Sequence, residues 1–178
     1  FWVKDAFVYK LFLYVLLEKI GAKQGVAPDD IFSFSQLGYT LAKIPNPSDS
    51  PDKWHIELIP LPDFSYPSLQ IQTHVIKDNY LYFFINRNDK AQLLVRKKLD
   101  FIDIPQISFE YYSTSKTWLS PIREDDMYTL VNGFRAITVN YHPEMKQWVM
   151  VCDIPFLDNK IRIRTAAELM GPWSDEKI

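Results

Sequence analysis

The chain has 178 residues, of which 47% are hydrophobic, 20 are Lys or Arg and 22 are Asp or Glu. This composition is typical of a soluble globular protein with a hydrophobic core. A net charge of −2, with no block of basic residues, argues against nucleic acid or an anionic membrane as the main partner.

Three features bear on the compartment. The longest apolar stretch, residues 9–17, is too short to span a bilayer and is interpreted as a core strand. The single Cys152 excludes an internal disulfide, and its apolar neighbours favour a small buried side chain over a reactive thiol. Because the sequence begins at Phe1 rather than Met, the lack of a signal peptide gives no evidence for a cytosolic origin.

The first 20 residues are apolar and aromatic almost throughout. Val8 continues into Tyr9 without turn residues, whereas residues 77–79 provide a turn at the matching place downstream. We therefore expect either one long strand or a loop that is missing from the sequence, and we favour the missing loop. A short helix over residues 11–20 is an alternative, because its apolar residues share one helical face.

Short β-branched and aromatic runs, separated by turns rich in Pro, Asn and Asp, predict strands along the rest of the chain. The predicted strands cover residues 31–35, 39–44, 69–76, 80–85, 91–96, 107–112, 135–141, 147–152 and 160–164. The last three runs are joined by turns at 142–146 and 157–159, which predicts an antiparallel meander of the size of one propeller blade.

Weaker copies of this meander precede it. Each copy has a basic residue late in a strand, followed by a polar segment that ends in Trp; these residues are Lys43, Arg96 and Arg164, and Trp54, Trp118 and Trp173. The repeat predicts an all-β fold, a single β-propeller domain over residues 1–178 with blades near 1–59, 68–120 and 133–178. An ordinary β-sandwich is the alternative. Propellers close with roughly four to eight blades, so three blades predict an incomplete propeller.

Two runs of the sequence, NYHPEMKQWVMV and IRIRTAAELMGPWS, resemble the late blade of the five-bladed propeller glycosidases. The most similar group is a bacterial domain of unknown function that includes endo-D-arabinanase-like members. The start FWVKD and the run GYTLAK resemble early segments of that group, so the resemblance covers most of the chain. Gly171-Pro172-Trp173 is its most specific part, and it predicts a rigid turn that buries an indole between neighbouring blades.

The resemblance implies a glycoside hydrolase that cleaves a furanoside or arabinan-type glycan by carboxylate acid/base catalysis. Such enzymes hold two carboxylates roughly 5 Å apart when they retain configuration and about 6.5–9.5 Å apart when they invert it. Asp5 is the catalytic candidate, because it is a lone carboxylate in an apolar aromatic run and matches an active-site aspartate of the family. An exposed strand-end aspartate is the alternative. A second catalytic carboxylate is expected upstream of Phe1.

One departure from the family pattern weighs against catalysis. The family's late blade tends to carry Glu just before the strand that here contains Ile137, and this chain has Ala136 there. Arg135 beside it is a candidate to bind a sugar hydroxyl or an anionic group, or else an ordinary strand-end arginine. The departure favours the alternative function, a propeller that binds carbohydrate or protein without hydrolysing it. A structural β-domain of a surface protein is a third reading.

The other candidate substrate-binding residues are Trp2, His74 and Asn140. Trp2 offers a stacking face for a sugar ring, as Phe1 and Tyr141 do, although each is also explained as a core aromatic. His74 is a candidate hydrogen-bond partner for the ligand or a satisfied core histidine. The three His lack ligand spacing, so no zinc site and no cofactor are expected, although a structural cation on the propeller axis is compatible with the fold. The resemblance implies an extracytoplasmic location.

Overall fold

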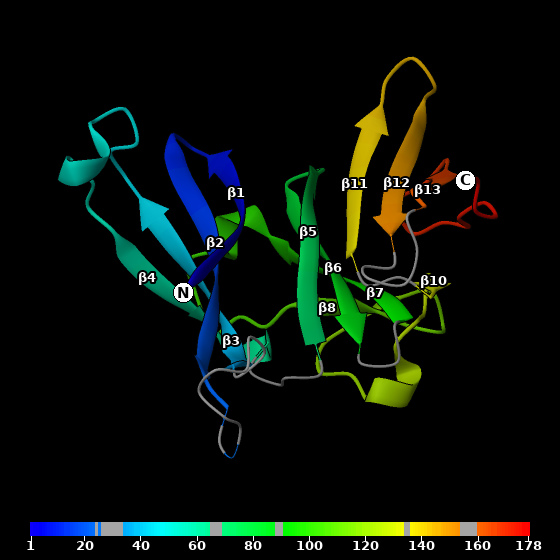
Figure 1. Cartoon of the computed structure of the whole chain (residues 1–178), viewed down its shortest axis with the longest axis horizontal. Coiled ribbons are helices and arrows are strands. Elements are labelled where there is room, and N and C mark those ends of the chain that lie inside the picture. Colours follow the sequence, from blue (N-terminus) through cyan, green and yellow to red (C-terminus); the bar gives the residue numbers. More distant parts are fainter. Residues whose placement is uncertain (24, 26–33, 65–68, 88–90, 134–135, 154–159) are drawn as a thin grey trace. The chain divides into compact units, whose positions relative to one another are not determined.

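The computed structural model describes residues 1–23, 25, 34–64, 69–87, 91–133, 136–153 and 160–178. These residues form an all-β fold of three antiparallel sheets with four short 3-10 helices, and they include no α-helix (Figure 1). No helix of the described part is long and apolar enough to cross a membrane. The 3-10 helices are η1 Pro51–Lys53, η2 Pro62–Phe64, η3 Leu99–Phe101 and η4 Glu124–Asp126.

Sheet 1 is a four-stranded meander in the order β1-β2-β3-β4. Its strands are β1 Trp2–Tyr9, β2 Phe12–Ala22, β3 Phe34–Ile44 and β4 Glu57–Leu61. The sequence predicted separate strands over residues 31–35 and 39–44, but β3 is continuous across residues 34–44. A register shift opposite Lys19 and Ile20 marks a bulge near Gly38, whose φ of 133° suits a residue without a side chain.

The connection between β1 and β2 corrects the prediction of a missing loop, and it also excludes the long strand and the short helix. Tyr9 pairs with Phe12, so Lys10 and Leu11 alone make the turn. Both have positive φ, 47° and 68° respectively. This is the type I′ geometry that matches the twist of the flanking strands, but here it is built without Asn or Gly. Turn composition therefore gave no sign of it.

Sheet 2 follows the order β5-β6-β7-β8-β9, and β10 pairs with the start of β7, at Ala91 and Gln92. Its strands are β5 Leu69–Lys77, β6 Tyr80–Arg87, β7 Ala91–Lys98, β8 Glu110–Tyr112, β9 Trp118–Leu119 and β10 Val131–Asn132. The predicted turn at Asp78 and Asn79 is confirmed, and it has the same positive-φ geometry as the first hairpin.

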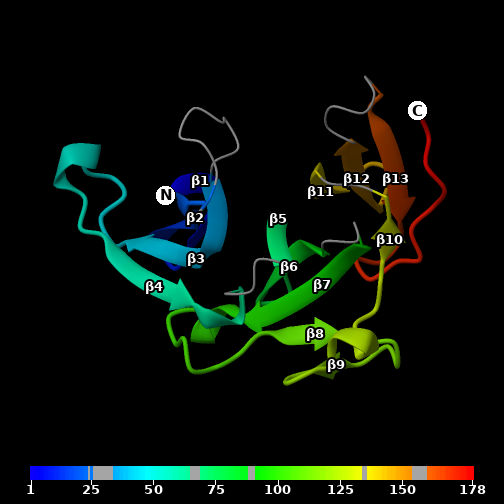
Figure 2. The ribbon, with the colours of Figure 1, turned by 60° about the horizontal axis from the view of Figure 1, so that its bottom comes forward.

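Sheet 3 is the predicted three-stranded meander. It consists of β11 Ala136–His142, β12 Gln147–Asp153 and β13 Arg162–Ala166. The C-terminal segment runs back along β13, as Figure 2 shows, and Lys177 and Ile163 exchange two backbone hydrogen bonds of 2.8 and 2.9 Å. Arg164 on β13 binds this segment, with its guanidinium 2.6 Å from the Ser174 carbonyl oxygen and 3.6 Å from the Glu176 carboxylate.

Sheets 1 and 2 repeat one another in detail. Their register shifts lie at the same place in the first strand, between Val3 and Asp5 and between Ile71 and Thr73. Each sheet also has a cation over an aromatic ring at matching positions. The Lys43 ammonium lies 4.6 Å from the Phe12 ring centre in sheet 1, and the Arg96 guanidinium lies 4.3 Å from the Tyr80 ring centre in sheet 2. Phe12 and Tyr80 each begin the second strand directly after the two-residue turn. The predicted equivalence of Lys43 and Arg96 is thus confirmed for these two sheets.

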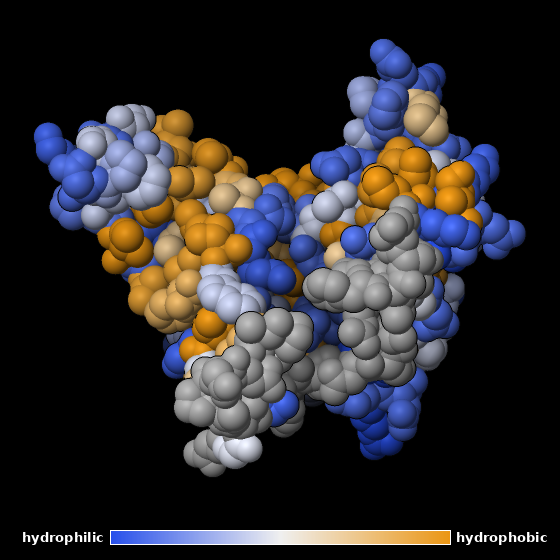
Figure 3. All heavy atoms as spheres, in the orientation of Figure 1, coloured by the Kyte–Doolittle hydropathy of each residue, from blue (hydrophilic) through white to orange (hydrophobic). Residues whose placement is uncertain are grey.

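The chain divides into two compact units, residues 1–67 with 101–107 and residues 68–100 with 108–178. In the first unit, one face of sheet 1 is buried with Phe64, which packs on Tyr39 with ring centres 6.4 Å apart. The other face carries exposed apolar side chains, including Val3, Val8 and Leu58, and Figure 3 shows apolar residues (orange) gathered over this sheet. Sheet 1 thus has one buried face and one exposed face, and both carry apolar side chains.

In the second unit, sheets 2 and 3 share one core, and β11 lies next to β5. The core contains buried residues of both sheets: Val75, Tyr82, Phe84, Leu94, Val131, Ile137, Val139, Trp148, Met150, Cys152 and Leu169. Trp173 packs on it with its ring centre 6.3 Å from that of Phe84. The prediction that the Gly-Pro-Trp turn packs its indole between adjacent sheets is confirmed for this pair.

Candidate functional site

The candidate site starts from the bulge in β1. Trp2 pairs with Glu18 and Asp5 pairs with Leu16, so Lys4 is the extra residue between them. Without it, positions 2 and 5 of a strand would point to opposite faces. The bulge therefore places Trp2, Asp5 and Glu18 on one face of sheet 1, the face that also carries Phe7 and Tyr14.

Asp5 is partly buried on this face, and its Oδ1 accepts a 2.9 Å hydrogen bond from the backbone N–H of Ala6. Trp2 is 44% exposed and contacts Phe34 edge-to-face, with ring centres 4.5 Å apart. A half-exposed indole held by a second ring is suited to stack on the apolar face of a sugar. The two residues predicted from the start of the chain therefore share a surface.

Glu18 is the functional candidate that sequence reasoning missed. Its residue is only 8% exposed, its Oε1 accepts a 3.3 Å hydrogen bond from the Tyr39 hydroxyl, and its Oε2 lies 3.7 Å from the Lys4 ammonium. The signal was available, because Glu18 is a carboxylate within the apolar run of β2 and shares the alternation phase of Tyr14 and Leu16. The bulge that aligns it with Asp5 has no such signal.

The register sets the spacing of the two carboxylates. Asp5 is directly opposite Leu16, and Glu18 is the next residue on the same face of β2. Diagonal neighbours of this kind lie roughly 7–8 Å apart. This is a spacing between backbone positions, and it is compatible with a carboxyl separation of about 6.5–9.5 Å, which inverting glycosidases use to place a water between the two groups.

The other predicted residues lie on the second unit. His74 is in β5 and Asn140 in β11, which are neighbouring strands. His74 follows Thr73 and precedes Val75, a core residue between sheets 2 and 3, so its side chain leaves the opposite face of sheet 2. Asn140 is exposed on the outer face of sheet 3, and the two side chains therefore do not converge in the shared core. Arg135 lies outside the described residues.

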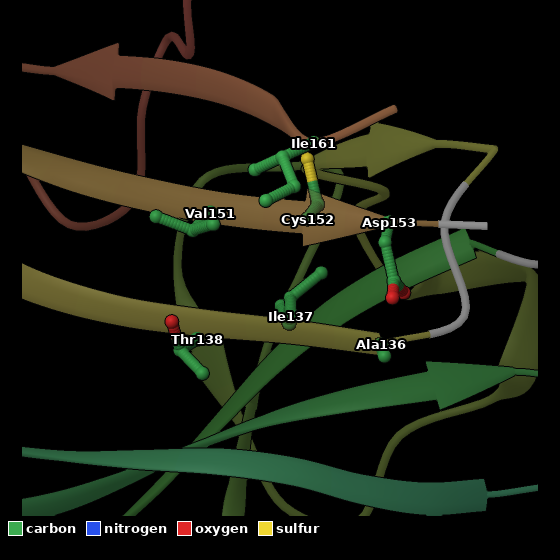
Figure 4. Close-up of a pocket in the computed structure, with 7 residues that line it drawn as sticks. All are labelled: Ala136, Ile137, Thr138, Val151, Cys152, Asp153 and Ile161. Atoms are coloured by element: carbon green, nitrogen blue, oxygen red, sulfur yellow. The ribbon is translucent and has the colours of Figure 1, made fainter. Parts of the chain in front are cut away.

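Ala136, where the resembling sequences tend to have Glu, has a carboxylate beside it. Ala136 pairs directly with Asp153, which points toward it from β12 in Figure 4. The two line a pocket of about 260 Å³ with Ile137, Val151 and other apolar side chains. Asp153 Oδ1 is buried without a hydrogen-bond partner in the described part of the chain. Burial raises the pKa of Cys152, which also lines this pocket, to about 11, which keeps its thiol protonated and poorly nucleophilic.

Within the described ranges, no group of three or more His, Cys, Asp or Glu side chains could hold a metal ion. The described candidate residues bring carboxylates, hydroxyls and aromatic rings to these surfaces. Sheet 1 gathers a carboxylate pair beside an exposed indole, whereas sheet 3 offers one carboxylate in an apolar pocket. Only the first arrangement provides the two carboxyl groups that glycoside hydrolysis requires.

A scan of protein-family models and a search of curated proteins found no match to this sequence. Among solved structures, a protein described as a "putative hydrolase from Bacteroides ovatus ATCC 8483" matches 99% of the chain at 16% identity, with a TM-score of 0.74. The structure of an α-L-arabinofuranosidase from Podospora anserina in complex with cellotriose aligns over 96% of this chain and 66% of its own at 12% identity, with a low TM-score of 0.41. The first likeness shows a shared fold, and the chain spans 44% of that protein's length.

Proposed function

We propose that the three sheets are successive blades of a β-propeller. The proposal is supported by the repeat between sheets 1 and 2 and by the face-to-face packing of sheets 2 and 3 in one core. The first strand of each sheet carries the candidate residues, with Trp2 and Asp5 on β1, His74 on β5 and Asn140 on β11. In a propeller the first strand of a blade is the one nearest the axis, where ligands bind.

We further propose that the protein is a glycoside hydrolase, secreted or otherwise extracytoplasmic, that acts on a furanoside glycan of the arabinan type. The observation that carries this proposal is the placement of Asp5 and Glu18 on one face, at a diagonal spacing, beside the exposed indole of Trp2. The substrate class comes from the resemblance of the late-blade motifs to endo-D-arabinanase-like proteins. The shared fold with a described hydrolase is compatible with it.

The two carboxyl groups would divide the reaction. The Asp5 carboxylic acid donates its proton to the glycosidic oxygen, and the bond from that oxygen to the anomeric carbon breaks. A water molecule attacks the anomeric carbon and gives one proton to the Glu18 carboxylate, so the products are a new reducing end and a free hydroxyl. The Lys4 ammonium and the Tyr39 hydroxyl contact the Glu18 carboxylate and would hold its orientation for this step.

The same contacts favour a second candidate function. Glu18 is 8% exposed and engaged by Lys4 and Tyr39, as a structural carboxylate would be. Ala136 also stands where the resembling family has Glu. Both observations fit a propeller that binds a glycan at Trp2 and Asp5 without cleaving it.

The experiment is a reducing-end assay of the full-length protein on linear arabinan and other furanoside polysaccharides. We expect hydrolysis by the wild type, and losses of roughly 10²–10⁴-fold in kcat for Asp5→Asn and for Glu18→Gln, the range for removal of a general acid or base. Asp52→Asn, at an exposed site in η1, is the matched control and should retain activity. Saturable binding without cleavage, weakened by Trp2→Ala, would instead establish the binding function.

A further inference from the structure

A second pocket in the 68–178 unit has the chemistry of a sugar site. It has a volume of about 420 Å³ and lies where β5 and β11 end. Its lining comes from three places in the chain: Ile76 and Lys77 of β5, Tyr141 and Trp148 of the β11–β12 hairpin, and Ala167 and Glu168 after β13. The volume is within the range of small-ligand sites. None of these residues belongs to the Asp5 and Glu18 set.

Tyr141 provides an aromatic surface in this pocket. Its side chain is 48% exposed, although its ring contacts Trp148 at 5.2 Å between centres and an angle of 61°. Trp148 is 6% exposed and belongs to the core shared by sheets 2 and 3, so it fixes the orientation of the tyrosine ring. A ring that is held from behind and accessible in front is suited to stack on the C–H face of a sugar at little entropic cost.

The polar groups of the pocket form a donor–acceptor pair. The Lys77 ammonium lies 3.9 Å from a Glu168 carboxylate oxygen and 3.1 Å from an Asp78 carboxylate oxygen. Glu168 is 64% exposed in its side chain, so its remaining lone pairs face solvent. The hydrogen bond to Asp78 raises the pKa of Lys77, which keeps it a cationic donor. A carboxylate can accept a hydrogen bond from one hydroxyl of a sugar, while the ammonium beside it donates one to the neighbouring hydroxyl.

We propose that this pocket binds one sugar unit of a neutral glycan, with the ring on Tyr141 and two adjacent hydroxyls on Glu168 and Lys77. The site's composition selects this class. Two carboxylates, Asp78 and Glu168, disfavour anionic ligands such as phosphates and uronates. A purely apolar ligand would displace water from the Lys77–Glu168 pair and offer no hydrogen bond in its place. The binding does not require the proposed hydrolysis, although a neutral glycan is also its substrate class.

The test uses the full-length protein and short, neutral arabino-oligosaccharides and cello-oligosaccharides as probes, with binding followed by ligand-observed NMR and calorimetry. To keep binding at sheet 1 from contributing, the titrations are made in the Trp2→Ala background. We expect saturable binding of at least one probe, a loss of about tenfold or more in Tyr141→Ala, and retention in Tyr141→Phe, which keeps the stacking ring. Glu168→Gln should weaken binding by about three- to tenfold, since it keeps the shape of the side chain and removes its charge.

Met145→Ala is the matched control, because Met145 is 50% exposed on the adjacent turn and does not line the pocket. Melting temperatures of the variants separate loss of binding from loss of folding. Failure of every probe to bind, or equal binding by the Trp2→Ala protein and by its Tyr141→Ala derivative, would overturn the proposal. Asp5→Asn distinguishes this site from the proposed hydrolase, because it should remove cleavage and leave binding at Tyr141 unchanged.

Discussion

The Tyr14 hydroxyl donates a 2.9 Å hydrogen bond to Asp103, which lies 89 residues further along the chain. The other oxygen of the same carboxylate binds the Lys43 ammonium. One carboxylate thus satisfies a buried phenol of β2 and a partly buried ammonium of β3, and it fastens residues 101–107 to sheet 1.

Asp103→Ala should therefore destabilise the first unit by about 2–3 kcal/mol, because it leaves both Tyr14 and Lys43 without their shared acceptor. Chemical denaturation with circular dichroism measures this. Asp100→Ala is the control: Asp100 accepts a 2.7 Å hydrogen bond from Asn79 in exposed surroundings, and its loss should cost less than about 1 kcal/mol. Equal costs for the two variants would contradict the assignment.

The two-residue turn at Lys10 and Leu11 predicts a stabilising substitution. Leu11 has a φ of 68° and is 85% exposed, so its side chain gains little from burial and strains the backbone. Leu11→Gly should raise stability by roughly 0.5–1 kcal/mol, seen as a higher Tm. Leu58→Gly, at an exposed position within β4, should lower it. A lower Tm for Leu11→Gly would show that the turn is not type I′.

Arg96 and Lys43 occupy equivalent positions but should respond differently to exchange. The Arg96 guanidinium lies 4.3 Å from the Tyr80 ring centre and 4.2 Å from that of Trp118, and its Nε is 2.7 Å from Glu110. Arg96→Lys should cost about 1–2 kcal/mol, since an ammonium cannot stack between two rings. Lys43 lies over one ring, that of Phe12, so Lys43→Arg should cost less stability than Arg96→Lys. Thermal denaturation compares them, and the reverse order would exclude a role for stacking.

Cys152 predicts a pH dependence of stability. Its pKa is raised by burial from 9.0 to about 11, so the folded state holds this proton more tightly than the unfolded state. The stabilising contribution is complete below pH 9 and is lost as the pH rises to about 11, on the order of 2 kcal/mol. Between pH 8 and pH 11, the difference in unfolding free energy between wild type and Cys152→Ala should shrink by this amount, because only the wild type loses the contribution. A constant difference would exclude a raised thiol pKa.

The sequence predicted those elements whose turns and alternation are visible in residue types. The meander of sheet 3 is one, because Pro143 and a polar loop separate two strongly β-forming runs. The Lys10–Leu11 turn was missed because neither residue is a usual choice for positive φ. Glu18 was missed for a related reason: a one-residue bulge at Lys4 decides which side chains share a face, and bulges leave no compositional trace.

The most direct test of the proposed function is an experimental structure of full-length Asp5→Asn with a bound arabino-oligosaccharide. The proposal predicts a sugar stacked on Trp2 with the residue 5 side chain and the Glu18 carboxylate on either side of one glycosidic bond, about 6.5–9.5 Å apart. A separation beyond about 10 Å, or a sugar bound without contact to Trp2 and Glu18, would contradict it.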